Sequence, residues 1–298
     1  MMPHIATDRR ANLQGAAWMV AAMAVFAIED VFIKAASVSI PLGQVLIVFG
    51  LGGTLLFAVL AKMRGESLFT RDVLSRPMWI RAIFECFGRL FYGLALALTP
   101  LSATTVILQA TPLVVVAGAA LIFGEKVGWR RWAAILIGLT GVLVILQPGA
   151  EGFSALSILA VLGMLGFAGR DLASRAAPRS LSAPVLGFYG FVPVALAGAA
   201  YGIWEGRAFV LPDGQAGLFL CGAVLAGVLA YGSLMTAMRM GEVSAVTPFR
   251  YTRLLFGIGF GVVLFGETIS PTMLVGSGLI VLSGLFILWR SRQKNASR

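Results

Sequence analysis

The sequence predicts an all-α polytopic membrane protein with ten transmembrane helices, arranged as a five-plus-five inverted repeat around a central cavity. Three observations support this fold class: an apolar composition, ten long apolar stretches, and a similarity between the two halves of the chain. Of the 298 residues, 59% are hydrophobic and only 12% are charged. Soluble domains carry about twice that share of charged residues, so the composition indicates a membrane protein.

The apolar stretches set the number of spans, since a helix needs about 20 apolar residues to cross roughly 30 Å of hydrocarbon. Connections are short, so consecutive helices are expected to be antiparallel neighbours. The first stretch follows Arg9 and Arg10, as in a signal peptide, but no small-residue cleavage site follows it, so we interpret it as a span. The predicted spans are residues 13–35, 42–61, 79–98, 102–123, 131–147, 155–177, 183–204, 214–238, 243–265 and 270–289.

Lysine and arginine gather in the loops on one side of these spans. Basic loops mark the cytoplasmic side, so both termini are expected to be cytoplasmic and the protein to lie in the inner membrane. The opposite side carries only Arg207, apart from Lys34 at a helix end. The basic residues on the predicted cytoplasmic side are Arg9, Arg10, Lys62, Arg64, Arg71, Arg76, Lys126, Arg130, Arg131, Arg175, Arg179, Arg239, Arg290, Arg292, Lys294 and Arg298.

The two halves of the chain share a charged motif. "FAIEDVFIKAA" (residues 26–36) matches "FAGRDLASRAA" (residues 167–177) without a gap, which pairs Asp30 with Asp171. Further matches follow in the same order with small changes of shift, so five helices are duplicated. These matches join residues 101–125 to residues 243–267, and residues 136–146 to residues 279–288.

Because five is odd, the second copy is expected to enter the membrane in the opposite sense. The result is an inverted repeat with a pseudo-two-fold axis in the membrane plane, which many secondary transporters use. The predicted divisions are a cytoplasmic leader (1–12), a first repeat (13–147), an extracytoplasmic connection (148–154), a second repeat (155–290) and a cytoplasmic tail (291–298).

The fourth predicted helix closes with "LQATPLVVVAGAALIFGEK" (Leu108 to Lys126), and a glycine-rich helix follows it. With the five-plus-five repeat, these motifs make nearly the whole chain resemble the ten-helix EamA branch of the drug/metabolite transporter superfamily. The resemblance implies a basket of helices with a substrate cavity lined mainly by the first, third, fourth, sixth, eighth and ninth, while the fifth and tenth are peripheral. Within the branch, the sequence looks most like bacterial exporters of aromatic amino acids.

Charged residues inside the first and sixth spans need an explanation, because an ionised side chain in lipid costs a few kcal/mol or more. Asp30 and Lys34 are four residues apart, as are Asp171 and Arg175. Each couple is expected to form an intrahelical pair that anchors a helix end near the membrane surface.

Glu29 and Arg170 are repeat mates of opposite charge, and neither has a partner four residues away in its own helix. If the halves face each other across a cavity, both side chains look into it. Two roles remain open: contact with substrate, or a pair between Glu29 and Arg170 that acts as a gate or a static brace.

The third predicted helix carries a polar stripe, with Arg81, Glu85 and Arg89 at four-residue steps and Tyr92 three residues further. Such a stripe is expected to face protein or a water path rather than lipid. Either Glu85 pairs with Arg89 within the helix, or Arg89 or Tyr92 contacts a carboxylate or an aromatic ring of the substrate.

Prolines interrupt one helix in each repeat, at Pro112 in the fourth helix and Pro248 in the ninth. Proline removes a backbone donor and frees a carbonyl, and such interruptions near mid-membrane point to a transport site. A kink that serves packing alone is the alternative. The candidate cavity residues, from these helices and their neighbours, are Glu29, Phe84, Glu85, Arg89, Tyr92, Gln109, Arg170, Tyr189, Tyr231, Arg250, Tyr251 and Arg253.

The cationic members of this set suit a substrate carboxylate, and the aromatic members could stack on an apolar or aromatic side chain. Together with the resemblance, they predict a secondary carrier that exports an amino acid, aromatic ones first, by alternating access. A multidrug or other metabolite carrier of the same superfamily is the alternative. A membrane enzyme acting on lipid-linked substrates is disfavoured, because the spans contain no histidine and no paired carboxylates at catalytic spacing.

Few residues could support metal or nucleotide chemistry. The one histidine is His4, and Cys86 and Cys221 fall in separate spans, so neither a metal site nor a disulfide framework is predicted. "FGEKVG" (residues 123–128) lacks the spacing and the hydroxyl of a phosphate-binding loop. No cofactor, nucleic acid or obligate protein partner is expected; the expected partners are a small-molecule substrate and the lipid bilayer.

Overall fold

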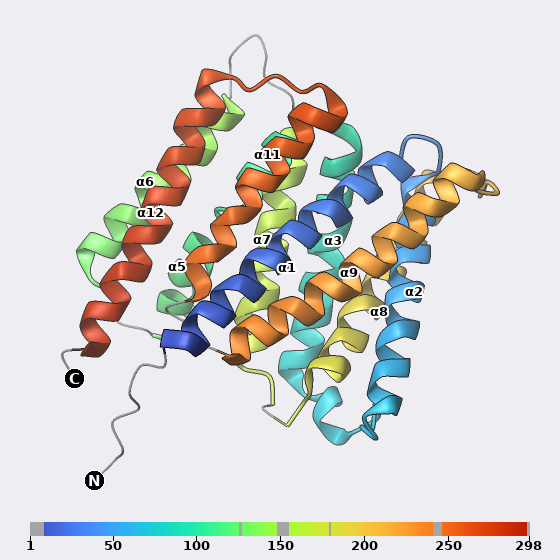
Figure 1. The fold of residues 1–298 in the computed structure, drawn as a ribbon, viewed down its shortest axis with the longest axis horizontal. Helices are drawn as coiled ribbons and strands as arrows, with labels where there is room; N and C mark the ends of the chain where they lie inside the picture. The colour runs from blue at the N-terminus through green and yellow to red at the C-terminus, as the bar shows by residue number, and fades with distance from the viewer. Residues whose placement is uncertain (1–8, 125–126, 148–154, 179, 241–245, 297–298) are drawn as a thin grey trace.

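The computed structural model describes residues 9–124, 127–147, 155–178, 180–240 and 246–296, and every regular element in these ranges is a helix (Figure 1). The all-helical prediction is therefore confirmed for the described residues. The elements are α1 (Arg9–Ala36), α2 (Leu42–Met63), η1 (Arg71–Leu74), α3 (Arg76–Leu98), α4 (Leu101–Leu108), α5 (Thr111–Phe123), α6 (Trp129–Leu146), α7 (Ser157–Arg175), α8 (Ala183–Glu205), α9 (Gly214–Met240), η2 (Thr247–Tyr251), α11 (Thr252–Phe265) and α12 (Pro271–Ala296).

Some predicted features lie outside the described residues. They are most of the leader, the whole connection 148–154, the first three residues of the ninth span, and the basic residues Lys126, Arg179 and Arg298.

Each predicted span has a helical counterpart, with α4 and α5 in series forming the fourth, and η2 and α11 forming the ninth. Among the described residues, seven helical stretches are long and apolar enough to cross a membrane, and α6 and α12 contain shorter apolar stretches. The charged stripe excludes α3 from these seven. The structure therefore supplies ten helical units, while ten membrane crossings stay a prediction.

The two halves pack against each other in a way that a two-fold axis would generate. The most extensive contacts join α1 to α9, α3 to α7, α2 to α8, and α6 to α12. Exchange of the halves turns the α1–α9 pair into the α7–α3 pair and leaves the other two pairs unchanged. This symmetry of packing agrees with the duplicated sequence motifs.

The corresponding helices of the two halves run in opposite directions. In Figure 1, α1 begins at the lower left of the bundle, and α12 ends on the same side, beside the C label. With an odd number of helical units in each half, a return to the same edge requires the second half to be inverted. We call this edge, where α1 begins and α12 ends, the terminal edge.

Both predicted helix interruptions are present. α4 ends at Leu108 and α5 begins at Thr111, just before Pro112. In the second half, Pro248 lies in the 3-10 segment η2, which leads directly into α11. Proline cannot donate a helical backbone hydrogen bond, which explains why the α-helical pattern breaks at these two points.

Glycines bring the two halves into close contact. A β-carbon added to Gly166 of α7 would lie 2.3 Å from the Cα atom of Gly88 on α3. One added to Gly163 would lie 2.9 Å from the backbone nitrogen of Tyr92. The α3–α7 interface therefore requires small residues, which let two backbones approach.

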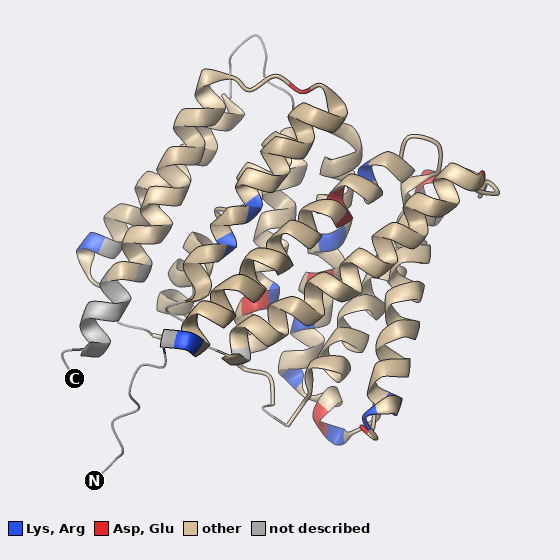
Figure 2. Cartoon of the chain, in the orientation of Figure 1, with Lys and Arg blue, Asp and Glu red and all other residues tan. Residues whose placement is uncertain are grey.

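Charged residues are distributed unevenly over the bundle (Figure 2). After Arg131, α6 contains no charged residue, and α12 contains none before Arg290. These two helices pack against each other at the side of the bundle, as the family resemblance implied for the fifth and tenth spans (Figure 1). The charges within spans instead lie on α1, α3, α7 and α11.

Candidate functional site

The polar stripe of α3 faces the protein interior. Arg81, Glu85 and Tyr92 are buried, and Arg89 is nearly so. Each of the four side chains contacts a residue from another helix rather than from α3 itself. The predicted orientation of the stripe is confirmed, whereas the alternative in which Glu85 pairs with Arg89 within the helix is wrong.

Two residues of the stripe, Arg89 and Tyr92, join Glu29, Asp30 and Arg253 in what we call the inner cluster. Nη1 of Arg89 donates to Oε1 of Glu29 at 2.6 Å, and Nη2 of Arg253 donates to Oδ2 of Asp30 at 2.6 Å. The Tyr92 hydroxyl donates to the same Asp30 oxygen at 3.0 Å. The exposed fractions of Glu29 and Asp30 are 1% and 0%, so two carboxylates and two guanidinium groups balance each other in a dry environment.

Aromatic rings surround the guanidinium groups. The Arg253 guanidinium lies 5.1 Å from the centre of the Phe26 ring, and that of Arg89 lies 5.5 Å from the centre of the Phe167 ring. The Arg170 guanidinium lies 4.7 Å from the centre of the same Phe167 ring. Phe26 and Phe167 are repeat mates, so both halves use the same position to place an aromatic ring against arginine, a favourable cation–π geometry.

Closer to the terminal edge, a second group, the open cluster, contains Glu85, Arg170, Asp171 and Arg250. Arg170 donates to Oδ1 of Asp171 from Nε at 2.9 Å and from Nη2 at 2.8 Å. Its Nη1 atom reaches the Glu85 carboxylate at 3.4 Å. Nη2 of Arg250 lies 3.9 Å from Oδ2 of Asp171, which is too long for a hydrogen bond.

The side chains of Glu29 and Arg170 do not pair with each other. The alternative in which they form a gate or a static brace with one another is therefore wrong. Each pairs instead with α3, Glu29 with Arg89 and Arg170 with Glu85. The physical reason is the position of α3, which contacts both α1 and α7 and offers a charge of the opposite sign to each.

The predicted intrahelical pair of Asp30 and Lys34 is also wrong. Asp30 pairs with Arg253, and Lys34 donates from Nζ to the carbonyl oxygens of Leu96 at 3.0 Å and Thr99 at 2.7 Å. Those carbonyls lie at the end of α3, where a cation is favoured by the helix dipole. The Arg175 side chain lies outside the described part, while its predicted partner Asp171 pairs with Arg170.

Glu267 braces the start of α4. Its carboxylate accepts hydrogen bonds from the backbone nitrogens of Leu101 at 2.6 Å and Ser102 at 2.9 Å, and from the Ser102 hydroxyl at 2.6 Å. Glu267 belongs to the second half and Ser102 to the first. With Lys34 at the end of α3, it fixes the α3–α4 corner at the edge opposite the termini.

Two further candidate residues support the open cluster. Nε2 of Gln109 donates to the backbone oxygen of Arg250 at 3.0 Å and so ties the α4 end to η2. The Tyr231 ring packs edge-on against Phe57, with 5.4 Å between the ring centres, and Tyr231 lies near the charged groups of Glu85 and Arg170.

The remaining three candidates lie outside both clusters. Phe84 is 38% exposed and packs beside Gly169. The Tyr189 hydroxyl donates to the backbone oxygen of Leu68 at 3.1 Å, which attaches α8 to the loop after α2. Tyr251 is buried against Gly284 of α12. We interpret these three as packing residues.

Four atoms of the inner cluster have no hydrogen-bond partner within the described part of the chain. They are Oε2 of Glu29, Oδ1 of Asp30, Nε of Arg89 and Nε of Arg253. Buried polar atoms are normally satisfied, so this interior has unused capacity for both donor and acceptor groups. The described residues contain no group of three or more histidine, cysteine or acidic side chains that could hold a metal ion.

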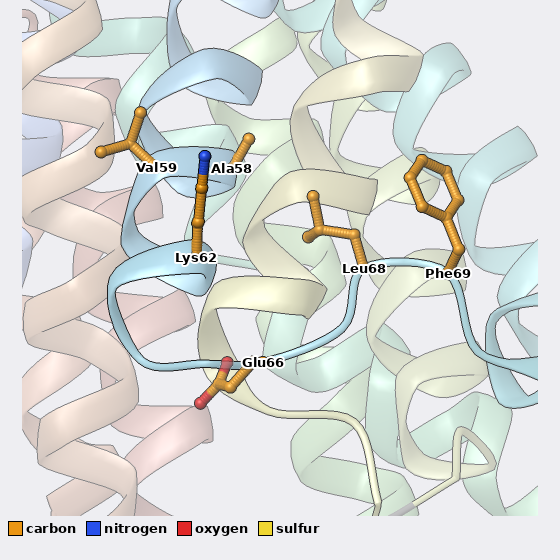
Figure 3. Close-up of a pocket in the computed structure, with 6 residues that line it drawn as sticks. All are labelled: Ala58, Val59, Lys62, Glu66, Leu68 and Phe69. Carbon is orange, nitrogen blue, oxygen red and sulfur yellow. The ribbon is translucent and has the colours of Figure 1, made fainter.

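A pocket of about 350 Å³ lies away from these clusters (Figure 3). It is formed by the end of α2 and the loop that follows, and its lining is mainly apolar. None of its residues was a candidate in the sequence. They are Ala58, Val59, Lys62, Glu66, Leu68 and Phe69.

The pattern that defines the EamA-like transporter family matches this chain twice, over residues 13–147 and 155–289. The chain belongs to the EamA-like transporter family. It is thus a multi-span membrane protein of a family of transporters. This finding confirms the superfamily and the two-part organisation that the sequence predicted.

Three relatives in the family show how varied its named substrates are. The riboflavin transporter of Vibrio cholerae is 26% identical, over 96% of this chain and 97% of its own. An S-adenosylmethionine uptake transporter of Rickettsia bellii is 26% identical over 74% of this chain and 75% of its own. The pseudopaline exporter CntI of Pseudomonas aeruginosa is 26% identical over 87% of this chain and 90% of its own. None of these names refers to aromatic amino acids, so the finer resemblance is not supported.

A solved crystal structure, among other matches, has a fold similar to that of this chain. It aligns with 95% of this chain and 98% of its own, with a TM-score of 0.61 and 19% sequence identity. At this identity the likeness concerns the fold alone.

Sequence reasoning undervalued Asp30 and Asp171, which it assigned to local pairs, and it left out Phe167. All three lie in the duplicated motif, and Asp30 and Asp171 are its only charged pair of identical residues. The sequence signal for these site residues was therefore the presence of the same acidic residue, inside a span, in both copies of the motif.

Proposed function

We propose that this EamA-family transporter carries a small metabolite bearing an α-amino-acid group, with amino acids, aromatic ones included, as the first candidates. The observation that carries the proposal is the pair of interior clusters, in which carboxylates and guanidinium groups lie side by side on α1, α3, α7 and the η2–α11 segment. Such a mixed environment can accept both the ammonium and the carboxylate of a zwitterion.

The relatives support a polar organic substrate. S-adenosylmethionine, named for one relative, carries an α-amino-acid group, whereas riboflavin, named for another, does not. The names include both uptake and export, so our proposed direction, export, needs its own measurement. A multidrug carrier would be expected to present a uniformly apolar interior, which the charged clusters disfavour.

We propose that transport proceeds by alternating access in the inner membrane, with both termini cytoplasmic. The halves are inverted, so a rocking motion can exchange the edge at which they separate. Ties between the halves occur at both levels of the bundle, through Glu267 with Ser102 at the far edge and through Glu85 with Arg170 nearer the terminal edge. During transport, the contacts at one edge must break while the contacts at the other edge remain.

The test is uptake by purified protein in proteoliposomes, with labelled L-phenylalanine, L-tyrosine, L-tryptophan, S-adenosylmethionine and riboflavin, with and without an imposed proton gradient. We expect at least one amino-acid-bearing compound to enter faster than into protein-free vesicles. Arg89→Gln, which breaks the inner cluster, is expected to abolish that flux, while Arg207→Gln in an exposed loop is expected to retain it. Uptake of riboflavin alone, or of no compound, would overturn the proposal.

A further inference from the structure

We propose that Arg250 is the residue that binds the carboxylate of the transported metabolite. This inference rests on the proposed function, because it assumes a cargo with an α-amino-acid group. It assigns recognition of the carboxylate of that group to one side chain on η2, in the more exposed of the two clusters.

The open cluster contains two guanidinium groups and two carboxylates, and the neighbouring Arg81, which bonds to Ser174 one turn from Arg170, adds a third cation. Arg81, Arg170 and Arg250 supply three guanidinium groups, whereas Glu85 and Asp171 supply two carboxylates. The inner cluster, by contrast, contains two of each and is balanced. A substrate carboxylate would neutralise the open cluster taken together with Arg81, and it would unbalance the inner cluster.

Among these three cations, Arg250 is the one that has a long ion pair in place of hydrogen bonds. Arg170 forms two hydrogen bonds to Asp171, and Arg81 donates to the Ser174 hydroxyl at 3.1 Å and to the Leu186 carbonyl at 3.3 Å. The Arg250 guanidinium makes no hydrogen bond within the described part, and its nearest carboxylate oxygen, on Asp171, is 3.9 Å away. Both hydrogen bonds of Arg170 go to Oδ1 of Asp171, and Oδ2, which faces Arg250, lies beyond hydrogen-bond distance of the Arg250 guanidinium.

Exposure distinguishes Arg250 from its neighbour on the same segment. The Arg250 side chain is 31% exposed, whereas that of Arg253 is 12% exposed and is held by Asp30. The Arg250 backbone is fixed, since its carbonyl accepts the hydrogen bond from Gln109. A fixed backbone with a free planar fork suits bidentate recognition of a carboxylate, the geometry that guanidinium groups favour.

The test compares a carboxylate substrate with its ester. For each panel compound that the wild-type protein carries, KM is measured together with the inhibition constant of its carboxyl methyl ester, in wild-type protein, Arg250→Gln, Arg250→Lys and the exposed control Arg207→Gln. We expect Arg250→Gln to raise KM about 10- to 100-fold, the loss typical of hydrogen bonds to a charged group. The inhibition constant of the ester should stay within about twofold, since a neutral ester gains little from the cation.

Arg250→Lys keeps the charge but loses the fork, so its KM should lie between those of the other two proteins. This variant also provides the answer if Arg250→Gln does not fold. An unchanged KM in both Arg250 variants, or an equal loss of affinity for the acid and the ester, overturns the assignment of Arg250. The proposed function is judged separately, by the flux through the wild-type protein. Wild-type transport of riboflavin alone, which has no carboxylate, overturns both.

Discussion

The buried pair of Asp30 and Arg253 offers a quantitative test of the inner cluster. Asp30 is fully buried and Arg253 nearly so, and their atoms are 2.6 Å apart. Removing one partner of such a pair costs about 3–5 kcal/mol, because the other charge stays buried without compensation. We expect Asp30→Asn and Arg253→Gln each to destabilise the protein by this order.

The two single variants should differ. Asp30→Asn leaves Arg253 near the Glu29 carboxylate, which partly compensates it. Arg253→Gln instead leaves Asp30 and Glu29 adjacent, with Arg89 as the remaining cation of the inner cluster, so this variant should be the less stable one.

The double variant Asp30→Asn with Arg253→Gln removes both charges and should be more stable than the sum of the single losses predicts. We expect a coupling free energy of about 2 kcal/mol, measured from the unfolding of detergent-solubilised protein. Tyr92 keeps an oxygen acceptor at Asn, so its hydrogen bond need not be lost. Losses that add within about 0.5 kcal/mol would refute the buried ion pair.

Three other predictions concern separate parts of the fold. Glu267→Ala removes three hydrogen bonds at the α3–α4 corner and should lower stability by roughly 2–3 kcal/mol, measured by the same unfolding assay; a loss below about 0.5 kcal/mol would argue against the brace. Gly166→Ala should destabilise the α3–α7 contact, whereas Gly232→Ala, where nothing lies within 4 Å, should be neutral or slightly stabilising; equal effects in thermal unfolding would contradict the close approach. The hypothesis that Glu29 carries a coupling proton predicts that Glu29→Gln abolishes accumulation driven by a proton gradient and leaves counterflow intact, and counterflow lost to the same degree would count against it.

The fold was largely predictable because its causes are local and repeated. The apolar stretches determined the helices, and the gap-free match around Asp30 and Asp171 determined the duplication. Proline determined the interruptions beside Thr111 and in η2, since the missing donor acts at its own position in the chain.

The partners of the charged residues were less predictable. Spacing of four residues favoured pairs within a helix, such as Asp30 with Lys34, and within α3. The observed pairs are between helices, because α3 lies between α1 and α7 and presents its stripe to both. That arrangement depends on the packing of the two halves, including the approach of Gly166 to Gly88, which a single sequence does not specify.

Counterflow in proteoliposomes tests most directly the claim that two inverted halves carry substrate through the charged interior. Vesicles containing the protein are loaded with an unlabelled panel compound and diluted into a trace of the same labelled compound. Alternating access predicts a transient accumulation of label above equilibrium, which Arg89→Gln should abolish and Arg207→Gln should preserve. Label that only approaches equilibrium, with the same time course in loaded and empty vesicles, would contradict the account.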